Sequence, residues 1–332
     1  MKYFYRSLVA LFLLILAWFS AGYFAFQYLI RPTSQSVPMP SDFEKYSAKA
    51  VVLTTKDDFK IASWWVEPFN PDTTRGAVIL MACLRGNRLT VASRARFYLK
   101  QGFATLLLDL RGTGESDGDF ISFGWYESQD VLAAVDYLKT KKQVKKIALH
   151  GLSAGAAAIC YALPELDSLH FIVLESCYDK MEHAFQNRVK QQFGLSKDFF
   201  YPVEFFAQRT FKNNFYKLNP IDYVAGIRCP VFILSGAEEY RVQKQETQAL
   251  FDRVQAPKRL WLVKGLGHTN FHRHQPVEYE RQLTQFLQEN NLIQGVLNNE
   301  SINHRSDSGR GQGTPFMAIN PEKSQTRRTH RR

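Results

Sequence analysis

The sequence predicts an α/β fold, in which a mostly parallel sheet carries helices on both of its faces. Three observations support this prediction. Short apolar runs alternate with helical patterns, the central runs are apolar at nearly every position, and a Gly-x-Ser-x-Gly pentapeptide stands between a strand pattern and a helix pattern. A parallel strand that helices cover on both faces has no solvent side, so it is apolar throughout.

The first expected element is a hairpin. Ala50–Thr55 and Ile61–Val66 are rich in β-branched and aromatic residues, and the turn signal Lys56-Asp57-Asp58 separates them. Further strands are expected at Ala77–Met81, Phe103–Leu108, Lys146–His150, Phe171–Leu174, Val231–Leu234 and Arg259–Val263. Helices are expected at Val91–Lys100, Trp125–Lys139, Ser153–Ala162, Lys244–Val254 and Pro276–Gln288. The alternation extends over about 250 residues, a common length for one domain.

Residues 181–228 interrupt this alternation as a long insertion between two strands, and they are expected to form a small helical cap. Ten phenylalanines and tyrosines lie between Phe185 and Tyr216. Such a segment suits a cap over an active site, a pocket for an acyl chain or a surface that faces a membrane. Packing among the helices of the insertion explains the aromatic residues as well.

Leu8–Ile30 is a run of 23 residues without a charged side chain. A helix of about 20 apolar residues crosses the hydrocarbon core of a bilayer, so the run predicts a single transmembrane anchor. Lys2 and Arg6 precede it, and the positive-inside rule then keeps the N-terminus in the cytoplasm. The alternative is a cleaved signal peptide with Leu8–Phe19 as its apolar region and Ser20-Ala21-Gly22 as its cleavage site. Both interpretations place the folded domain on the non-cytoplasmic side.

The expected organisation is therefore a cytoplasmic N-terminus (residues 1–7), the anchor, a linker (31–40), one domain (41–293) and a tail (294–332). The tail is polar and basic, which predicts disorder. From His304 to Arg332 it holds seven basic and two acidic residues, so it contributes +5 of the formal net charge of +11. Binding to acidic lipid or nucleic acid is the functional alternative for the tail. No nucleic-acid partner is expected for the domain, because it has no basic stripe interleaved with aromatic residues.

The pentapeptide Gly151-Leu152-Ser153-Ala154-Gly155 carries the strongest chemical signal. It follows an expected strand and opens an expected helix, which is the context that a nucleophile elbow requires. Small flanking residues permit the tight turn, and the hydroxyl then lies near the positive end of a helix dipole. The sequence therefore predicts Ser153 as a catalytic nucleophile.

A serine hydroxyl needs a base to become nucleophilic near neutral pH. In this arrangement an acid and then a histidine follow the serine along the chain. His268 follows the last expected strand and is the predicted base. Glu239, three residues after Gly236, is the predicted acid, which would hold the tautomer of His268 and stabilise its protonated form. Glu238 is the alternative acid.

A metal site and a disulfide framework are not expected. His268, His272 and His274 lie close together in the sequence, but no cluster of carboxylates or cysteines accompanies them. The four cysteines show no CxxC pair and lie in or next to apolar runs, so they are expected to be buried small residues. They are Cys83, Cys160, Cys177 and Cys229.

Acyl transfer by a serine also needs an oxyanion hole, in which each donor contributes roughly 10²–10³ in rate. One expected donor is the backbone N–H of Ala154, the residue after the nucleophile. The other is expected in the loop Ala82-Cys83-Leu84-Arg85-Gly86-Asn87, where the position indicates the N–H of Leu84.

With these residues in place, the chain resembles the α/β-hydrolase superfamily and, within it, the serine aminopeptidase-like group of membrane-linked hydrolases. The resemblance covers roughly Ala50–Leu287. Three segments besides the catalytic residues carry it, namely Asp109–Ser116 (DLRGTGES), Leu174–Tyr178 (LESCY) and Ile227–Pro230 (IRCP). It implies an eight-stranded sheet whose second strand is antiparallel, hydrolysis of acyl bonds and no cofactor. Asp109, Arg111 and Glu175 are then structural turn residues rather than catalysts.

The chain departs from this group in the oxyanion loop. Ala82-Cys83 stands where the group usually has His-Gly, so a Cβ replaces a glycine close to the substrate. Three functions remain open at this point. The first is an esterase, lipase-like or thioesterase activity on a small-molecule acyl substrate, lipids included. The second is a peptidase activity of the aminopeptidase kind, and the third is a membrane-tethered scaffold without catalysis.

Overall fold

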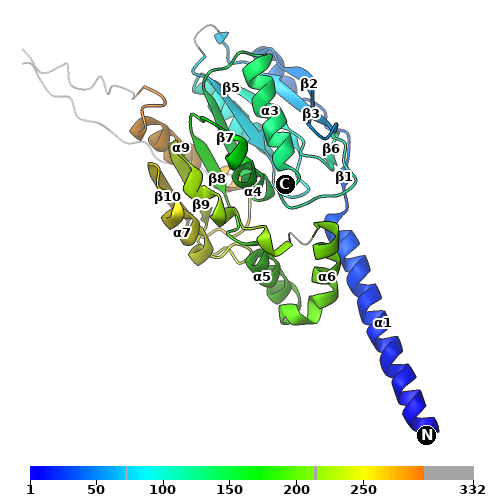
Figure 1. Ribbon diagram of the computed structural model, residues 1–332. Helices are drawn as coiled ribbons and strands as arrows, with labels where there is room; N and C mark the ends of the chain where they lie inside the picture. The colour runs from blue at the N-terminus through cyan, green and yellow to red at the C-terminus, as the bar shows by residue number, and fades with distance from the viewer. Residues whose placement is uncertain (72–73, 213–214, 295–332) are drawn as a thin grey trace, which may run out of the picture. The chain divides into compact units, whose positions relative to one another are not determined.

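The computed structural model describes residues 1–294 except 72–73 and 213–214. Its central element is a sheet of eight strands, shown in Figure 1. Their spatial order is β10 (Lys258–Val263), β9 (Val231–Gly236), β8 (Ile172–Glu175), β7 (Ile147–Leu152), β4 (Ala77–Met81), β5 (Ala104–Leu108), β3 (Lys60–Val66) and β2 (Lys49–Thr54). Every neighbouring pair is parallel except β2–β3 and β3–β5, which are antiparallel. The predicted α/β fold with a mostly parallel sheet is confirmed.

The inner strands are buried at every position, as the continuous apolar runs predict. Successive side chains of β4 point to opposite faces of the sheet. Ile79 accordingly belongs to one apolar core, whereas Val78 and Leu80 belong to the other. The sheet therefore needs helices on both faces, and both cores extend into helices.

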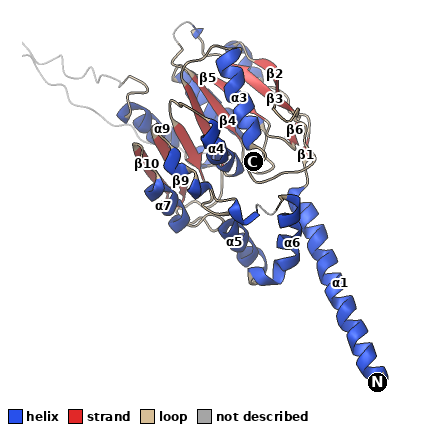
Figure 2. Ribbon diagram, viewed as in Figure 1, coloured by secondary structure: helices blue, strands red, loops and turns tan. Residues whose placement is uncertain are grey.

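The two layers of helices are visible in Figure 2. The core on one face includes residues of α3 (Ser128–Thr140), α4 (Ala154–Ala162) and α7 (Lys244–Arg253). The core on the other face includes residues of α2 (Ala92–Lys100) and α9 (Pro276–Glu289). Short 3₁₀ helices lie at Ser41–Tyr46, Arg88–Val91, Leu163–Glu165, Lys197–Phe200, Phe215–Lys217, Pro220–Asp222 and Val224–Gly226.

Some boundaries differ from the sequence prediction for local reasons. Helix α3 begins at Ser128 rather than at Trp125. The Glu127 carboxylate accepts hydrogen bonds from the backbone N–H groups of Ser122 and Gly124 (2.7 and 2.8 Å), which folds the preceding residues into a turn. Two small elements have no counterpart in the prediction. They are the parallel pair β1 (Thr33–Ser34) and β6 (Thr113–Gly114), and the short helix α8 (Phe271–His274).

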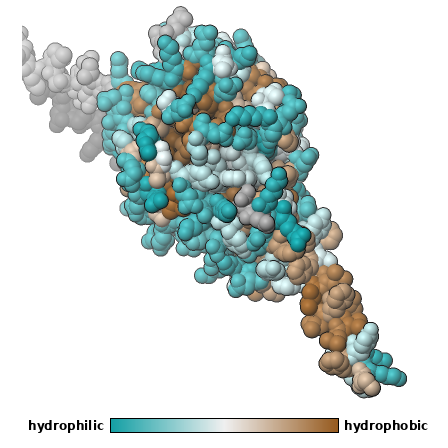
Figure 3. All heavy atoms as spheres, viewed as in Figure 1, coloured by the Kyte–Doolittle hydropathy of each residue, from teal (hydrophilic) through white to brown (hydrophobic). Residues whose placement is uncertain are grey.

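Helix α1 (Lys2–Ile30) has 29 residues and is long and apolar enough to cross a membrane. It projects from the domain on the same side as α5 (Met181–Phe193) and α6 (Tyr201–Thr210), and its apolar surface is visible in Figure 3. Its first half is exposed, whereas Gly22, Phe26 and Ile30 are buried. The C-terminal half of α1 is thus packed against the rest of the domain.

Candidate active site

Ser153 occupies the turn between β7 and α4. Its backbone has φ 52° and ψ −110°, a conformation that costs a non-glycine residue free energy and is usual at functional turns. Its N–H donates to the Glu175 carbonyl at 2.7 Å. The flanking glycines are required by space, because a Cβ on Gly151 would lie 2.5 Å from the carbonyl carbon of Gly155, and one on Gly155 would lie 2.6 Å from the Ala82 oxygen.

The structure brings His268 and Glu239 together. His268 Nδ1 lies 2.8 Å from Glu239 Oε2, and the Glu239 side chain is fully buried (0% exposed). The second Glu239 oxygen accepts from the Arg241 N–H at 2.9 Å. Glu238, in contrast, is exposed. Of the two neighbouring acids, Glu239 is the one that contacts His268.

Ser153 and His268 are not joined by a hydrogen bond among the residues that the structure describes. The serine hydroxyl turns about a single torsion, and catalytic hydrogen bonds of ligand-free enzymes are often long until a substrate binds. His272 and His274 take no part in the pair. His272 Nε2 lies 3.0 Å from Glu280, and His274 is exposed.

The two residues that are expected to supply oxyanion donors share a cavity wall with Ser153. Leu84, Ser153 and Ala154 line the same cavity. Leu84 is held in a turn that the hydrogen bond from the Gly86 N–H to the Cys83 carbonyl closes (2.8 Å), with Arg85 in the left-handed region at φ 62°. Within the described residues, neither the Leu84 N–H nor the Ala154 N–H donates to another group.

This cavity has a volume of about 240 Å³ and a mainly apolar wall. The loops and helix that follow the sheet strands contribute Leu84, Phe123, Ser153, Ala154 and Tyr178. The cap segment, defined as residues 181–228, contributes Met181, Ala184, Phe185, Arg188, Val189, Gln192, Phe193, Phe200, Val203, Ala207 and Phe215. Helix α1 contributes Ala25, Phe26, Tyr28 and Leu29. An apolar cleft with a few polar groups is the usual form of a small-molecule site.

A buried charged network behind Ser153 is the main feature that the sequence analysis missed. Arg94 forms a two-pronged ion pair with Glu175 (3.1 and 2.8 Å), and His150 Nε2 lies 2.6 Å from the same carboxylate. Arg94 also donates to Asn270 Oδ1 at 2.7 Å. The backbone carbonyl of Glu175 accepts from the Ser153 N–H, and Asn270 follows His268 by two residues. The network therefore links the segment that holds Ser153 to the segment that holds His268.

The protonation of this network follows from its surroundings. Burial alone would raise the pKa of Glu175, but Arg94 and His150 outweigh burial and hold that pKa well below its usual value. Burial lowers the pKa of His150 and so favours its neutral form. The network therefore contains a charged Arg94–Glu175 pair. Removing one partner of such a buried pair strongly destabilises the folded protein, because the other charge stays buried without compensation. No local sequence pattern indicates the network, because Arg94 and Glu175 are 81 positions apart.

Asp109 and Arg111 have the structural partners that their turn positions suggest. Asp109 is buried and accepts from the N–H groups of Arg88 (2.7 Å) and Glu115 (2.9 Å). Arg111 pairs with Asp57 (2.6 Å) and Asp130 (2.8 Å). Neither residue lines the cavity.

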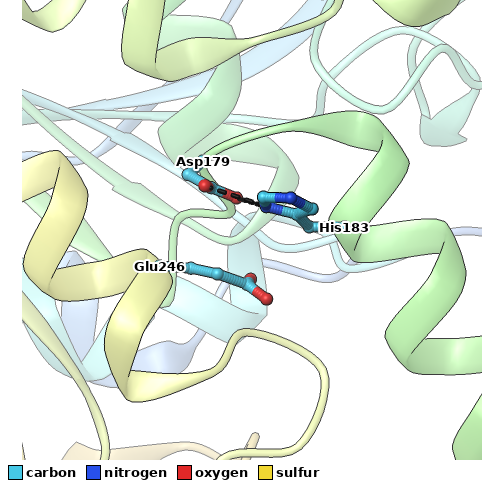
Figure 4. Close-up of side chains that lie close together, drawn as sticks. All are labelled: Asp179, His183 and Glu246. Carbon is cyan, nitrogen blue, oxygen red and sulfur yellow. Dashed lines mark hydrogen bonds and ion pairs between the residues drawn. The ribbon is translucent and has the colours of Figure 1, made fainter.

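One group of side chains has the composition of a metal site. Asp179, His183 and Glu246 offer ligand atoms within 4.8 Å of one another, as Figure 4 shows. Their own contacts account for most of their polar atoms, however. His183 Nδ1 lies 2.9 and 3.0 Å from the Asp179 oxygens, and Glu246 Oε1 accepts from Asn187 at 2.6 Å. The hydrogen bond from Asn187 to Glu246 links α5 to α7, and the second oxygen of Glu246 is buried without a partner among the described residues.

The chain is similar to known proteins in sequence and in structure. A relative of unknown function, YqkD of Bacillus subtilis, is 23% identical over 77% of this chain and 85% of its own length. The esterase Pf2001 of Pyrococcus furiosus has the same fold, with a TM-score of 0.66 and 23% identity over 79% of this chain and 98% of that protein. The acylaminoacyl peptidase of Pyrococcus horikoshii matches with a TM-score of 0.57 and 14% identity, over 73% of this chain and 41% of the peptidase.

The family assignment comes from the sequence. Residues 90–292 match the model of the prolyl oligopeptidase family, and this range covers more than half of the chain. The match includes the turn at Ser153 and the loops that carry Glu239 and His268. The chain belongs to the prolyl oligopeptidase family and is a serine hydrolase with the α/β-hydrolase fold.

Proposed function

We propose that the protein is a membrane-anchored esterase or thioesterase that cleaves a small-molecule acyl substrate with Ser153, His268 and Glu239. One observation carries the proposal. The His268–Glu239 pair, 2.8 Å apart and with a fully buried acid, accompanies a serine in a strained turn that opens into an apolar cavity. A buried carboxylate on Nδ1 leaves Nε2 of the histidine as the proton acceptor.

The proposed reaction has two steps. His268 takes the proton of Ser153 as the oxygen attacks the acyl carbonyl, and the N–H groups of Leu84 and Ala154 stabilise the negative oxygen that forms. The leaving alcohol or thiol receives the proton from His268, and an acyl-enzyme remains. Water that His268 activates then hydrolyses this ester and releases the acid.

The cavity wall favours an ester over a peptide with a free amino end. An aminopeptidase needs a carboxylate that pairs with the substrate ammonium group. Among the described residues that line the cavity, none is Asp or Glu, and the one charged side chain is Arg188. Peptidase activity is the second candidate, and an inactive scaffold is the third.

Membrane attachment rests on helix α1. Its apolar length suits a span, and Lys2 and Arg6 would keep its first residues in the cytoplasm, so that the domain lies on the non-cytoplasmic side. Release of the protein by alkaline carbonate extraction would contradict the anchor and favour a cleaved signal peptide. The basic tail proposed at residues 294–332 lies almost wholly outside the described residues.

A fluorophosphonate probe tests the catalytic proposal. We expect the probe to label the purified full-length protein, the Ser153→Ala variant to remain unlabelled, and the Ser196→Ala variant to label normally, because Ser196 is an exposed residue outside the cavity. Labelling that persists in Ser153→Ala would exclude Ser153 as the nucleophile. The absence of labelling in every variant would favour the scaffold.

The same preparation distinguishes an esterase from a peptidase. p-Nitrophenyl esters of graded chain length are compared with aminoacyl anilides at equal concentration. We expect Ser153-dependent turnover of the esters to exceed that of the anilides at least tenfold. Faster turnover of the anilides would establish the peptidase instead.

A further inference from the structure

Arg188 on α5 is the one charged side chain among the described residues of the cavity wall. It shares this wall with Ser153, and its side chain is partly buried. In the part of the chain that the structure describes, its guanidinium group forms no hydrogen bond and no ion pair. A cation that faces an apolar cavity without a partner lacks the interactions that normally offset its loss of hydration.

Two further arginines increase the positive charge around Arg188. Arg85 donates to the carbonyls of Tyr28 and Leu29 at the end of α1 (2.5 and 3.2 Å). Arg241 stacks near the Tyr240 ring, with 5.7 Å between guanidinium and ring centre, and its Nε is buried without a partner. Neither of them pairs with an acid among the described residues.

The surroundings of Arg188 act against its charge. Burial lowers the pKa of Arg188, and the neighbouring Arg241 and Arg85 lower it further. Glu239 acts in the opposite direction, but its two oxygens already contact His268 and the Arg241 N–H. The positive charge at this point of the wall is therefore uncompensated among the described residues, and ionisable groups perturbed in this way cluster at functional sites.

The position of Arg188 relative to the cavity indicates which part of a ligand carries the anion. Asn187, the residue before it on α5, donates to the Arg241 carbonyl at 3.3 Å, so this part of α5 lies against the loop after β9, which also holds the proposed catalytic acid. The aromatic residues of α1 and of the cap segment form the apolar part of the wall. A hydrocarbon chain suits this apolar part, and a negative charge suits the side of the loop after β9.

We propose that Arg188 binds a phosphate or carboxylate group on the alcohol part of the substrate, so that the enzyme prefers anionic amphiphilic esters over neutral ones. This inference rests on the proposed esterase function and narrows its substrate class. Arg188 is a binding residue in this proposal, and Arg85 and Arg241 contribute electrostatic attraction.

Three esters with one acyl chain test the preference. They are 1-dodecanoylglycerol, 1-dodecanoylglycerol 3-phosphate and O-dodecanoyl lactate, assayed with the full-length protein in the same detergent. We expect kcat/KM for at least one of the two anionic esters to exceed that for the neutral ester tenfold or more. The better of the two identifies phosphate or carboxylate as the recognised group. A preference below tenfold for both anionic esters would contradict the proposal.

Variants of Arg188 assign the preference to this side chain. In Arg188→Gln we expect the anionic-to-neutral ratio of kcat/KM to fall at least tenfold, mainly through KM, and Arg188→Lys to recover part of the ratio. Lys190→Gln is the matched control, because Lys190 is an exposed cation on the same helix and outside the cavity wall. A ratio that falls equally in Lys190→Gln, or that does not fall in Arg188→Gln, would contradict the assignment.

Binding and stability keep the test independent of catalysis. Dodecyl phosphate, which is not a carboxylic ester, is expected to raise the Tm of the wild type and of Ser153→Ala but not of Arg188→Gln. If dodecyl phosphate does not raise the Tm of the wild type and the ester preference is below tenfold, the anion site is overturned. If the Tm rises but no ester is hydrolysed, only the esterase proposal is overturned. Arg188→Met is expected to unfold at a Tm equal to or above that of the wild type, because an unpaired charge is removed. A clearly lower Tm would show Arg188 to be a structural residue.

Discussion

At the scale of single residues, Glu238 and Glu239 offer a matched comparison. Glu239 is buried and contacts His268 at 2.8 Å, whereas Glu238 is exposed. In Glu239→Gln we expect kcat for a p-nitrophenyl ester to fall by about 10²–10⁴, because the amide no longer stabilises the protonated histidine or fixes its tautomer. In Glu238→Gln we expect kcat within about twofold of the wild type. Comparable losses in both variants would refute the assignment of the acid.

Local sequence patterns were sufficient to predict the three candidate catalytic residues. Ser153 lies in a pentapeptide, and the acid and the histidine follow strands whose apolar runs are easy to recognise. The sequence did not predict the Arg94–Glu175 network, because the partners of a buried ion pair are brought together only by the packed fold. Glu175 was expected to be a turn residue. Its carbonyl accepts from the Ser153 N–H, and its carboxylate pairs with Arg94, so it belongs to the buried network as well as to the turn.

At the scale of elements, α1 divides into two parts with different surroundings. Ser7 to Leu16 lie outside the core, whereas Trp18 donates to the Phe199 carbonyl at 2.9 Å and the Tyr23 and Phe206 rings lie 5.2 Å apart. Hydropathy treats the whole apolar run alike, so the sequence predicted a uniform anchor. The contact with α6 depends on the aromatic residues of the cap segment, for which the sequence left four interpretations open.

Two phenylalanines of α1 test whether its second half belongs to the domain. Phe26 is 2% exposed and lines the cavity, whereas Phe24 is 70% exposed. We expect Phe26→Ala to lower the free energy of unfolding in detergent by about 3–5 kcal/mol, because the buried ring leaves a cavity. That loss corresponds to a fall in Tm of roughly 6–20 °C for a domain of this size. Phe24→Ala is the control and is expected within about 0.5 kcal/mol of the wild type. Equal effects would indicate that α1 is independent of the domain.

At the scale of the whole molecule, the length of α1 limits how far the domain stands from the bilayer. Its unpacked part, Lys2–Ala17, has 16 residues and is about 24 Å long at 1.5 Å per residue. The hydrocarbon core of a bilayer is about 30 Å thick. A spanning α1 must therefore bring Trp18 and the cap segment to the membrane surface.

The exposed side chains near Trp18 suit that position. Phe199 and Tyr201 are 56% and 51% exposed, and both lie beside α1 through ring contacts with Trp18 and Phe19. Aromatic residues are enriched where a protein meets the interface of a bilayer. The part of the cavity wall that α1 and the cap segment form would then lie near the lipid.

Lipid quenching of tryptophan fluorescence measures this arrangement. With the full-length protein in bilayers of brominated lipid, we expect Trp18→Phe to remove most of the quenchable emission. Trp261→Phe is the control. Trp261 lies on β10 at one end of the sheet order, and its emission is expected to be unquenched, so removing it should leave the quenchable emission unchanged. If the bilayer reaches Trp18, bromine atoms on the adjoining acyl chains lie within contact range of its ring. Quenching that is unchanged in Trp18→Phe would mean that Trp18 does not reach the lipid and would contradict a spanning α1.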